Sequence, residues 1–77
     1  MTRREKLLAK ARANPKGLSF GELERLLSNS GFTLARQSGS HRIWLSPSNR
    51  AIPLQSDRGR AKAYQVVQAL RLIEEDS

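Results

Sequence analysis

Residue types that suit proton transfer and anion binding gather in one short stretch, Arg36–Ser46, around the single histidine of the chain, His41. Histidine titrates near neutral pH, so it can both take and give a proton. RNA needs little more for cleavage, because its own 2′-hydroxyl attacks phosphorus once a base removes the proton and cations stabilise the developing charge. The ordinary interpretation is a polar residue at the surface or core edge, and spacing alone favours it.

The neighbours of His41 also allow two interpretations each. Gly39 lets a phosphate approach the backbone and Ser40 adds a hydroxyl donor, yet Ser38-Gly39 is also an ordinary hairpin turn. Trp44 offers a ring on which a base can stack, and it suits the core equally well. Basic side chains are candidates for phosphate contacts, although those around Gly59 also suit a solvated helix start. These basic candidates are Arg36, Arg42, Arg58, Arg60 and Lys62.

The net charge of +7 is the strongest global signal. Residues 25–73 hold eight of the 14 basic residues and one acid, and seven of these eight are arginine. Arginine forks onto phosphate and stacks on bases. The charge therefore predicts a polyanionic partner, with nucleic acid first, and the alternative is a solvated basic surface.

Composition limits the other classes of function. With no cysteine, one histidine and dispersed acids, the chain offers no disulfide framework and no plausible metal cluster, and we expect no cofactor. No apolar run approaches the roughly 18 residues that span a bilayer, and the charged start is unlike a signal peptide. We therefore expect one soluble cytoplasmic domain over residues 1–77, with a helical extension over 1–17 and a core over 18–75.

The helices are marked by their caps. Thr2 and Glu5 fit a capping box for a helix over 2–13, which either packs as an accessory element or frays. Ser19 and Glu22 form a second capping box for a helix over 19–29. The third helix, over 60–75, has an apolar stripe of Ala63, Val66, Val67, Leu70 and Ile73, and its acidic end opposes the helix dipole and is expected to fray.

Three short strands are predicted between the last two helices, over 32–37, 40–45 and 50–54, with Pro53 marking an edge. Alternation along the middle strand leads us to expect Ile43 and Leu45 toward the helices, His41 on the same face at the margin of the core, partly shielded yet reachable, and Arg42 and Trp44 on the open face. The fold class is thus α+β, an α-β-β-β-α core with a three-stranded antiparallel sheet and helices on one face. That order is the topology of double-stranded-RNA-binding domains, and topology alone does not settle function.

The chain resembles the HicA-type toxins, which are small basic RNA-cleaving proteins of prokaryotic toxin–antitoxin pairs. The resemblance covers roughly residues 18–75 and includes the Gly-Ser-His centre with its aromatic strand. It is carried by Gly31-Phe32, the run 36–44, Ile52-Pro53 and the run 63–70.

The resemblance implies a double-stranded-RNA-binding-like fold, metal-independent cleavage of messenger RNA and a HicB-type antitoxin that covers the basic face. The catalytic histidine of the family falls on His41. Many members carry a second histidine shortly after the Ile-Pro of the third strand, where this chain has Leu54-Gln55. A glutamine cannot shuttle protons near pH 7.

Three hypotheses follow. In the first, the protein is an endoribonuclease toxin, with His41 as general acid and base. In the second, it is an RNA-binding module of the same fold without catalysis, which the missing second histidine favours. In the third, it is a basic adaptor whose open face and edge strand take an acidic protein.

Overall fold

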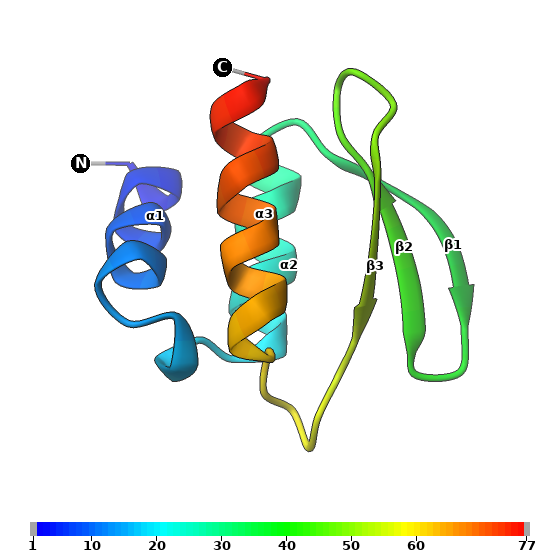
Figure 1. Cartoon of the computed structure of the whole chain (residues 1–77), viewed down its shortest axis with the longest axis horizontal. Coiled ribbons are helices and arrows are strands. Elements are labelled where there is room, and N and C mark those ends of the chain that lie inside the picture. Colours follow the sequence, from blue (N-terminus) through cyan, green and yellow to red (C-terminus); the bar gives the residue numbers. More distant parts are fainter. Residues whose placement is uncertain (1, 77) are drawn as a thin grey trace.

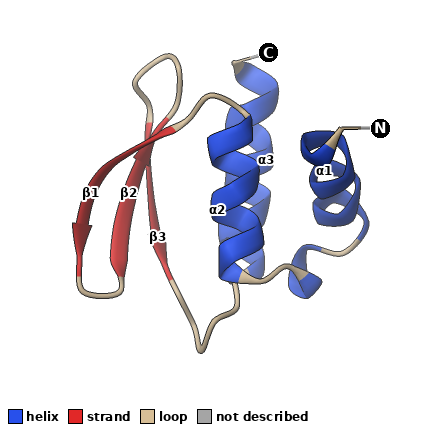
Figure 2. Ribbon diagram, turned by 180° about the vertical axis from the view of Figure 1, so that it is seen from behind, coloured by secondary structure: helices blue, strands red, loops and turns tan. Residues whose placement is uncertain are grey.

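The computed structural model describes residues 2–76 and has the expected order of elements (Figure 1). Met1 and Ser77, the ends of the expected domain, lie outside the described residues. Helices α2 and α3 lie between α1 and the sheet (Figures 1 and 2). The elements are α1 (Arg3–Ala13), a 3₁₀ turn (Pro15–Gly17), α2 (Phe20–Asn29), β1 (Thr33–Ser38), β2 (His41–Leu45), β3 (Ala51–Gln55) and α3 (Ala63–Glu75).

Side-chain caps start the first two helices. At α2, the Ser19 hydroxyl accepts a hydrogen bond from the Glu22 N–H at 3.1 Å, and the Glu22 carboxylate accepts one from the Ser19 N–H at 3.0 Å. The predicted capping box is therefore confirmed. At α1, the Thr2 hydroxyl accepts a hydrogen bond from the Glu5 N–H at 3.1 Å. Two of the backbone donors that a helix start leaves unpaired are satisfied at α2 and one at α1.

The sheet has the order β1-β2-β3, and both pairings are antiparallel. Ser38 pairs with His41, so the hairpin turn consists of Gly39 and Ser40, one residue later than expected. Gly39 has φ +60°, while φ of Ser40 is not positive, which is the pattern of a type II′ turn. Pro53 lies in β3, an edge strand, as predicted, and an edge tolerates its missing N–H.

The expected facing of β2 is wrong. Trp44 is only 8% exposed and pairs with the buried Ile52, whereas His41 is exposed. Arg42 pairs with the buried Leu54, so Arg42 and Trp44 are the side chains that point toward the helices. Burying an indole ring removes more apolar surface from water than burying the smaller side chains of the opposite face, which decides the orientation.

The first and the last helix both pack against the core. Leu7, Leu8 and Ala11 are buried, so α1 packs on α2 and α3 as an accessory element. The acidic end of α3, which we expected to fray, is helical to Glu75. Arg50, in the loop before β3, forms an ion pair with Glu75, and this contact offsets the unfavourable charge at the helix end.

Helix α3 begins at Ala63, three residues later than the expected Arg60. The preceding loop is held by the start of α2 instead. The Phe20 N–H donates to the Gly59 carbonyl at 2.9 Å, and the backbones of Arg60 and Ser19 pair in an isolated antiparallel β-bridge. Backbone groups committed to these contacts are not available for a helical turn.

The buried face of α3 also differs from the expected stripe. Gln65, Ala69 and Leu72 are buried, while Val67 is 46% exposed. A polar glutamine therefore takes a buried position on the side of the helix that meets the sheet, and a valine faces outward. The apolar period of the sequence does not account for a buried glutamine at this position.

The capping box of α2 generates a prediction on pH dependence. The pKa of Glu22 lies below its ordinary value, because its carboxylate accepts hydrogen bonds from the Lys10 ammonium and from the Ser19 backbone. A carboxyl group of this kind stabilises the fold above its unfolded pKa, and the contribution is lost as pH falls through the folded value. We expect Glu22→Gln to lower Tm at pH 7, with the difference from wild type shrinking below about pH 4.5 in thermal melts.

The matched control is Glu5→Gln, at the same helix position of α1. Glu5 has no ion-pair partner among residues 2–76, so we expect Glu5→Gln to lower Tm less than Glu22→Gln does. A difference between wild type and Glu22→Gln that is equal at pH 7 and pH 3 would contradict the prediction.

Candidate functional site

His41 borders a cleft of about 260 Å³ that opens where the β2–β3 ladder meets α3. The residues around it come from three elements and from both faces of the sheet, because the cleft lies at the end of the ladder. Its composition is unusual for a basic protein, with three carboxamides and one aromatic ring. The lining residues are His41, Arg42, Ile43, Pro53, Leu54, Gln55, Tyr64, Gln65 and Gln68.

The sheet sets the neighbours of His41. His41 begins the central strand and is the ladder partner of Ser38 on one side and Gln55 on the other. Directly opposite residues have Cβ atoms about 4.5–5.5 Å apart, so Gln55 is adjacent to the imidazole on the same face. Arg36 is opposite Ile43 and is therefore a diagonal neighbour of His41 on that face. The sheet thus brings a titratable group, an amide and a guanidinium together.

The turn before His41 is open to solvent. Gly39 and Ser40 are both exposed, and a Cβ placed on Gly39 would meet no atom within 4 Å. The glycine is therefore required by its positive φ and not by close packing within the chain. The turn leaves room for an anion beside the hydroxyl of Ser40.

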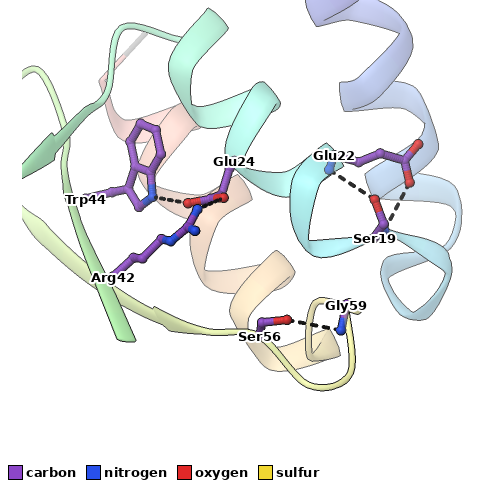
Figure 3. A network of polar contacts seen from close by, with 7 residues as sticks. All are labelled: Ser19, Glu22, Glu24, Arg42, Trp44, Ser56 and Gly59. Atoms are coloured by element: carbon purple, nitrogen blue, oxygen red, sulfur yellow. Dashed lines mark hydrogen bonds and ion pairs between the residues drawn. The ribbon is translucent and has the colours of Figure 1, made fainter. Parts of the chain in front are cut away.

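Two expected RNA contacts, Arg42 and Trp44, point toward Glu24 of α2 (Figure 3). The Glu24 carboxylate of α2 accepts hydrogen bonds from the Trp44 indole N–H at 3.1 Å and from the Arg42 guanidinium, with which it forms an ion pair. The guanidinium carbon also lies 5.6 Å from the centre of the Phe20 ring. Trp44 is buried, so the expected stacking of a base on its ring is not supported, and the charge of Arg42 is balanced within the fold.

The other basic candidates lie in the loop between β3 and α3. Arg58, Arg60 and Lys62 do not border the cleft. Arg58 and Gly59 have positive φ, at 54° and 81°, and the Ser56 hydroxyl accepts a hydrogen bond from the Gly59 N–H at 3.1 Å (Figure 3). Arg58 and Arg60 are exposed and have no ion-pair partner among residues 2–76. They form a flanking positive charge close in sequence to Gln55.

Three residues of the cleft were missed as candidates from the sequence. Tyr64, Gln65 and Gln68 lie on one side of the first turns of α3, because positions three and four apart are neighbours on a helix. The available signal was a glutamine at a helical position that the apolar period should have filled. The cleft itself forms only where α3 packs against β2 and β3, so the sequence alone does not show that these residues line it.

The Glu24 network generates a stability prediction. Removing this carboxylate leaves the Trp44 N–H and the Arg42 guanidinium, which lie largely inside the protein, without an acceptor. We expect Glu24→Ala to lower the free energy of unfolding by about 2 kcal/mol, the scale for unsatisfied buried polar groups. Urea unfolding followed by circular dichroism measures the change.

A double-mutant cycle with Arg42→Ala separates pairing from packing. We expect the double variant to lose less than the sum of the two single losses, because the second substitution removes a partner that is already unpaired. Additive losses would show that Glu24 and Arg42 do not stabilise each other.

Among known protein families, one matches most of the chain. The family model described as HicA toxin of bacterial toxin–antitoxin matches residues 20–74. Searches of curated proteins and of solved structures found no match. Within residues 2–76, no three metal-ligating side chains cluster, and no helix has the length and hydropathy needed to cross a membrane.

Proposed function

Because the chain belongs to the HicA toxin family, whose members are the toxins of bacterial toxin–antitoxin pairs, we propose that it is an endoribonuclease that cleaves messenger RNA with His41 as general acid and base. The observation that carries the proposal is the position of His41. The one histidine of the chain is exposed, borders a cleft and stands beside a turn that can admit a phosphate.

The proposed chemistry uses the nucleophile of RNA itself. His41 removes the proton of a 2′-hydroxyl, whose oxygen attacks the adjacent phosphorus while the bond to the 5′-oxygen breaks. His41 then returns the proton to the leaving 5′-oxygen, and the products are a 2′,3′-cyclic phosphate and a 5′-hydroxyl. Every proton is accounted for by one imidazole, and no step needs a metal ion.

The residues around His41 supply positioning and charge in this proposal. The Ser40 hydroxyl and the Gly39 backbone hold the phosphate, and Arg36 stabilises the negative charge that builds up on its oxygens. The loop cations Arg58, Arg60 and Lys62 attract the flanking backbone of the RNA. Trp44 contributes by packing, because its ring is buried, and Arg42 by its ion pair with Glu24.

The family and the net charge of +7 support two further assignments. We propose that the partner is a HicB-type antitoxin that covers the basic surface around His41. A substrate of messenger RNA would place the activity in the cytoplasm. Electrostatic attraction of an acidic partner and of RNA to the same surface makes the two compete.

The catalytic assignment is tested with single-stranded RNA in EDTA. We expect wild type to cleave it and His41→Ala to be at least about a hundredfold slower, the lower end of what a positioned acid–base group contributes. Because His41 is exposed, the Tm of the variant should stay near that of wild type. Gel analysis of end-labelled RNA measures both rates.

Arg3→Ala is the control, because Arg3 is an exposed residue of α1, on the far side of the helices from the sheet. It should cleave as wild type does. Cleavage by His41→Ala at the wild-type rate, or failure of a folded wild type to cleave, would refute the assignment.

Gln55 gives a second, more specific prediction. It is the ladder partner of His41, at the place where many family members have another histidine. We expect Gln55→His to raise the cleavage rate about tenfold, because a second imidazole lets one group act as base and the other as acid. Single-turnover kinetics separate this gain from a change in RNA affinity.

Gln37→His is the matched control, since Gln37 pairs with Arg42 on the opposite face of the sheet. It should leave the rate unchanged. Equal rates for wild type and Gln55→His would mean that a second imidazole at this position takes no part in proton transfer.

The second candidate function is RNA binding without cleavage, and Gln55 is the observation that favours it. With one imidazole, the site can hold RNA while lacking an efficient acid for the leaving group. This alternative predicts RNA binding that weakens steeply with salt and yields no cleavage products. The experiment in EDTA therefore decides between the two candidates.

A further inference from the structure

The cleft beside His41 is lined by polar amides and an aromatic ring that the cleavage of a phosphodiester does not require. Its volume of about 260 Å³ lies just below the roughly 300–1,000 Å³ of typical small-molecule pockets. Such a space suits one flat ring better than a chain of linked groups. Ile43, Pro53 and Leu54 give it apolar walls, which favour an aromatic ring over a sugar or a phosphate.

Gln65 is the least expected residue in this cleft. The residue is 2% exposed, and its carboxamide oxygen is buried without a hydrogen-bond partner among residues 2–76. Buried polar atoms are nearly always paired, so an unpaired one calls for an explanation such as a missing ligand. A carboxamide presents a donor and an acceptor side by side, which matches the edge of a nucleobase.

Tyr64 lies next to Gln65 at the border of the cleft and is 64% exposed. Proteins that bind single-stranded RNA commonly stack an unpaired base on an aromatic ring and read its edge with polar side chains. Gln55 and Gln68 border the same space and supply two further amides. Since no acid lines the cleft, nothing there repels an RNA strand.

We propose that this cleft binds one unstacked nucleobase of the RNA substrate, with Tyr64 stacking on its face and Gln65 hydrogen-bonded to its edge. The proposal rests on RNA being the substrate, as inferred above, and adds a base-binding subsite to it. Because His41 borders the same cleft, a base held there brings the RNA strand to the end of the sheet where His41 lies. Cleavage would then favour sites whose adjacent nucleotide can leave the base stack.

The first test uses nuclear magnetic resonance with adenosine and with ribose 5-phosphate as probes. We expect adenosine to shift the signals of Tyr64 and the side-chain amide of Gln65, and ribose 5-phosphate, which has no base, to leave them unchanged. Equal shifts with both probes would assign the cleft to sugar or phosphate and overturn the proposal. Shifts with adenosine only at other residues would overturn it as well.

The second test measures binding of a single-stranded RNA octamer whose 2′-hydroxyls are methylated, so that it lacks the attacking group. We expect Tyr64→Ala to weaken binding at least about fivefold and Tyr64→Phe, which keeps the ring, to bind as wild type does. Gln65→Met keeps the volume and removes the amide, and it should also weaken binding. Its Tm should not fall, because the replaced oxygen is unpaired.

Wild-type affinity in both Tyr64→Ala and Gln65→Met would overturn the proposal. Loss of binding to the antitoxin alone, with RNA binding unchanged, would assign the cleft to that protein and overturn it too. Neither readout depends on catalysis. A wild type that binds adenosine in the cleft but cleaves no RNA would refute the nuclease function and leave the base-binding subsite supported.

Discussion

The structure depends on one carboxylate, that of Glu24, which ties the sheet to α2. It accepts hydrogen bonds from Arg42 and Trp44, two residues of β2 that share a face, and its own side chain is 14% exposed (Figure 3). Side chains alternate along a strand, so turning 42 and 44 inward turns His41 outward. The exposure of the one histidine is therefore a consequence of a contact made on the other side of the sheet.

Features that depend on neighbours in sequence could be predicted from the sequence. Ser19 and Glu22 meet within one turn, so their capping box follows from spacing alone. Pro53 has no N–H to donate, which favours an edge strand, and β3 is one. The order of elements and the position of His41 at the opening of β2 follow from such local rules.

Features that depend on distant partners could not be predicted in this way. Alternation along β2 defines two sets of side chains but does not say which set is buried. Burial of the Trp44 ring and the contact with Glu24, eighteen residues before Arg42, decide it together. The same holds for α3, where period alone favours Val67 inside and the packed structure buries Gln65. No local pattern predicts a buried glutamine in that place, and its surroundings, the cleft between α3 and the sheet, form only when these elements pack together.

This division also decides where the unpaired positive charge of the candidate site lies. Arg42, the cation nearest to His41 in sequence, is balanced by Glu24 and is held by the fold. The free positive charge comes instead from Arg36 on β1 and from the loop after β3, which flank the histidine from two sides. Contacts between such cations and phosphate position a nucleic-acid strand but carry no sequence information. In the proposed complex, a preference among bases then comes from the cleft, whose amides, apolar walls and tyrosine ring suit a base better than a phosphate.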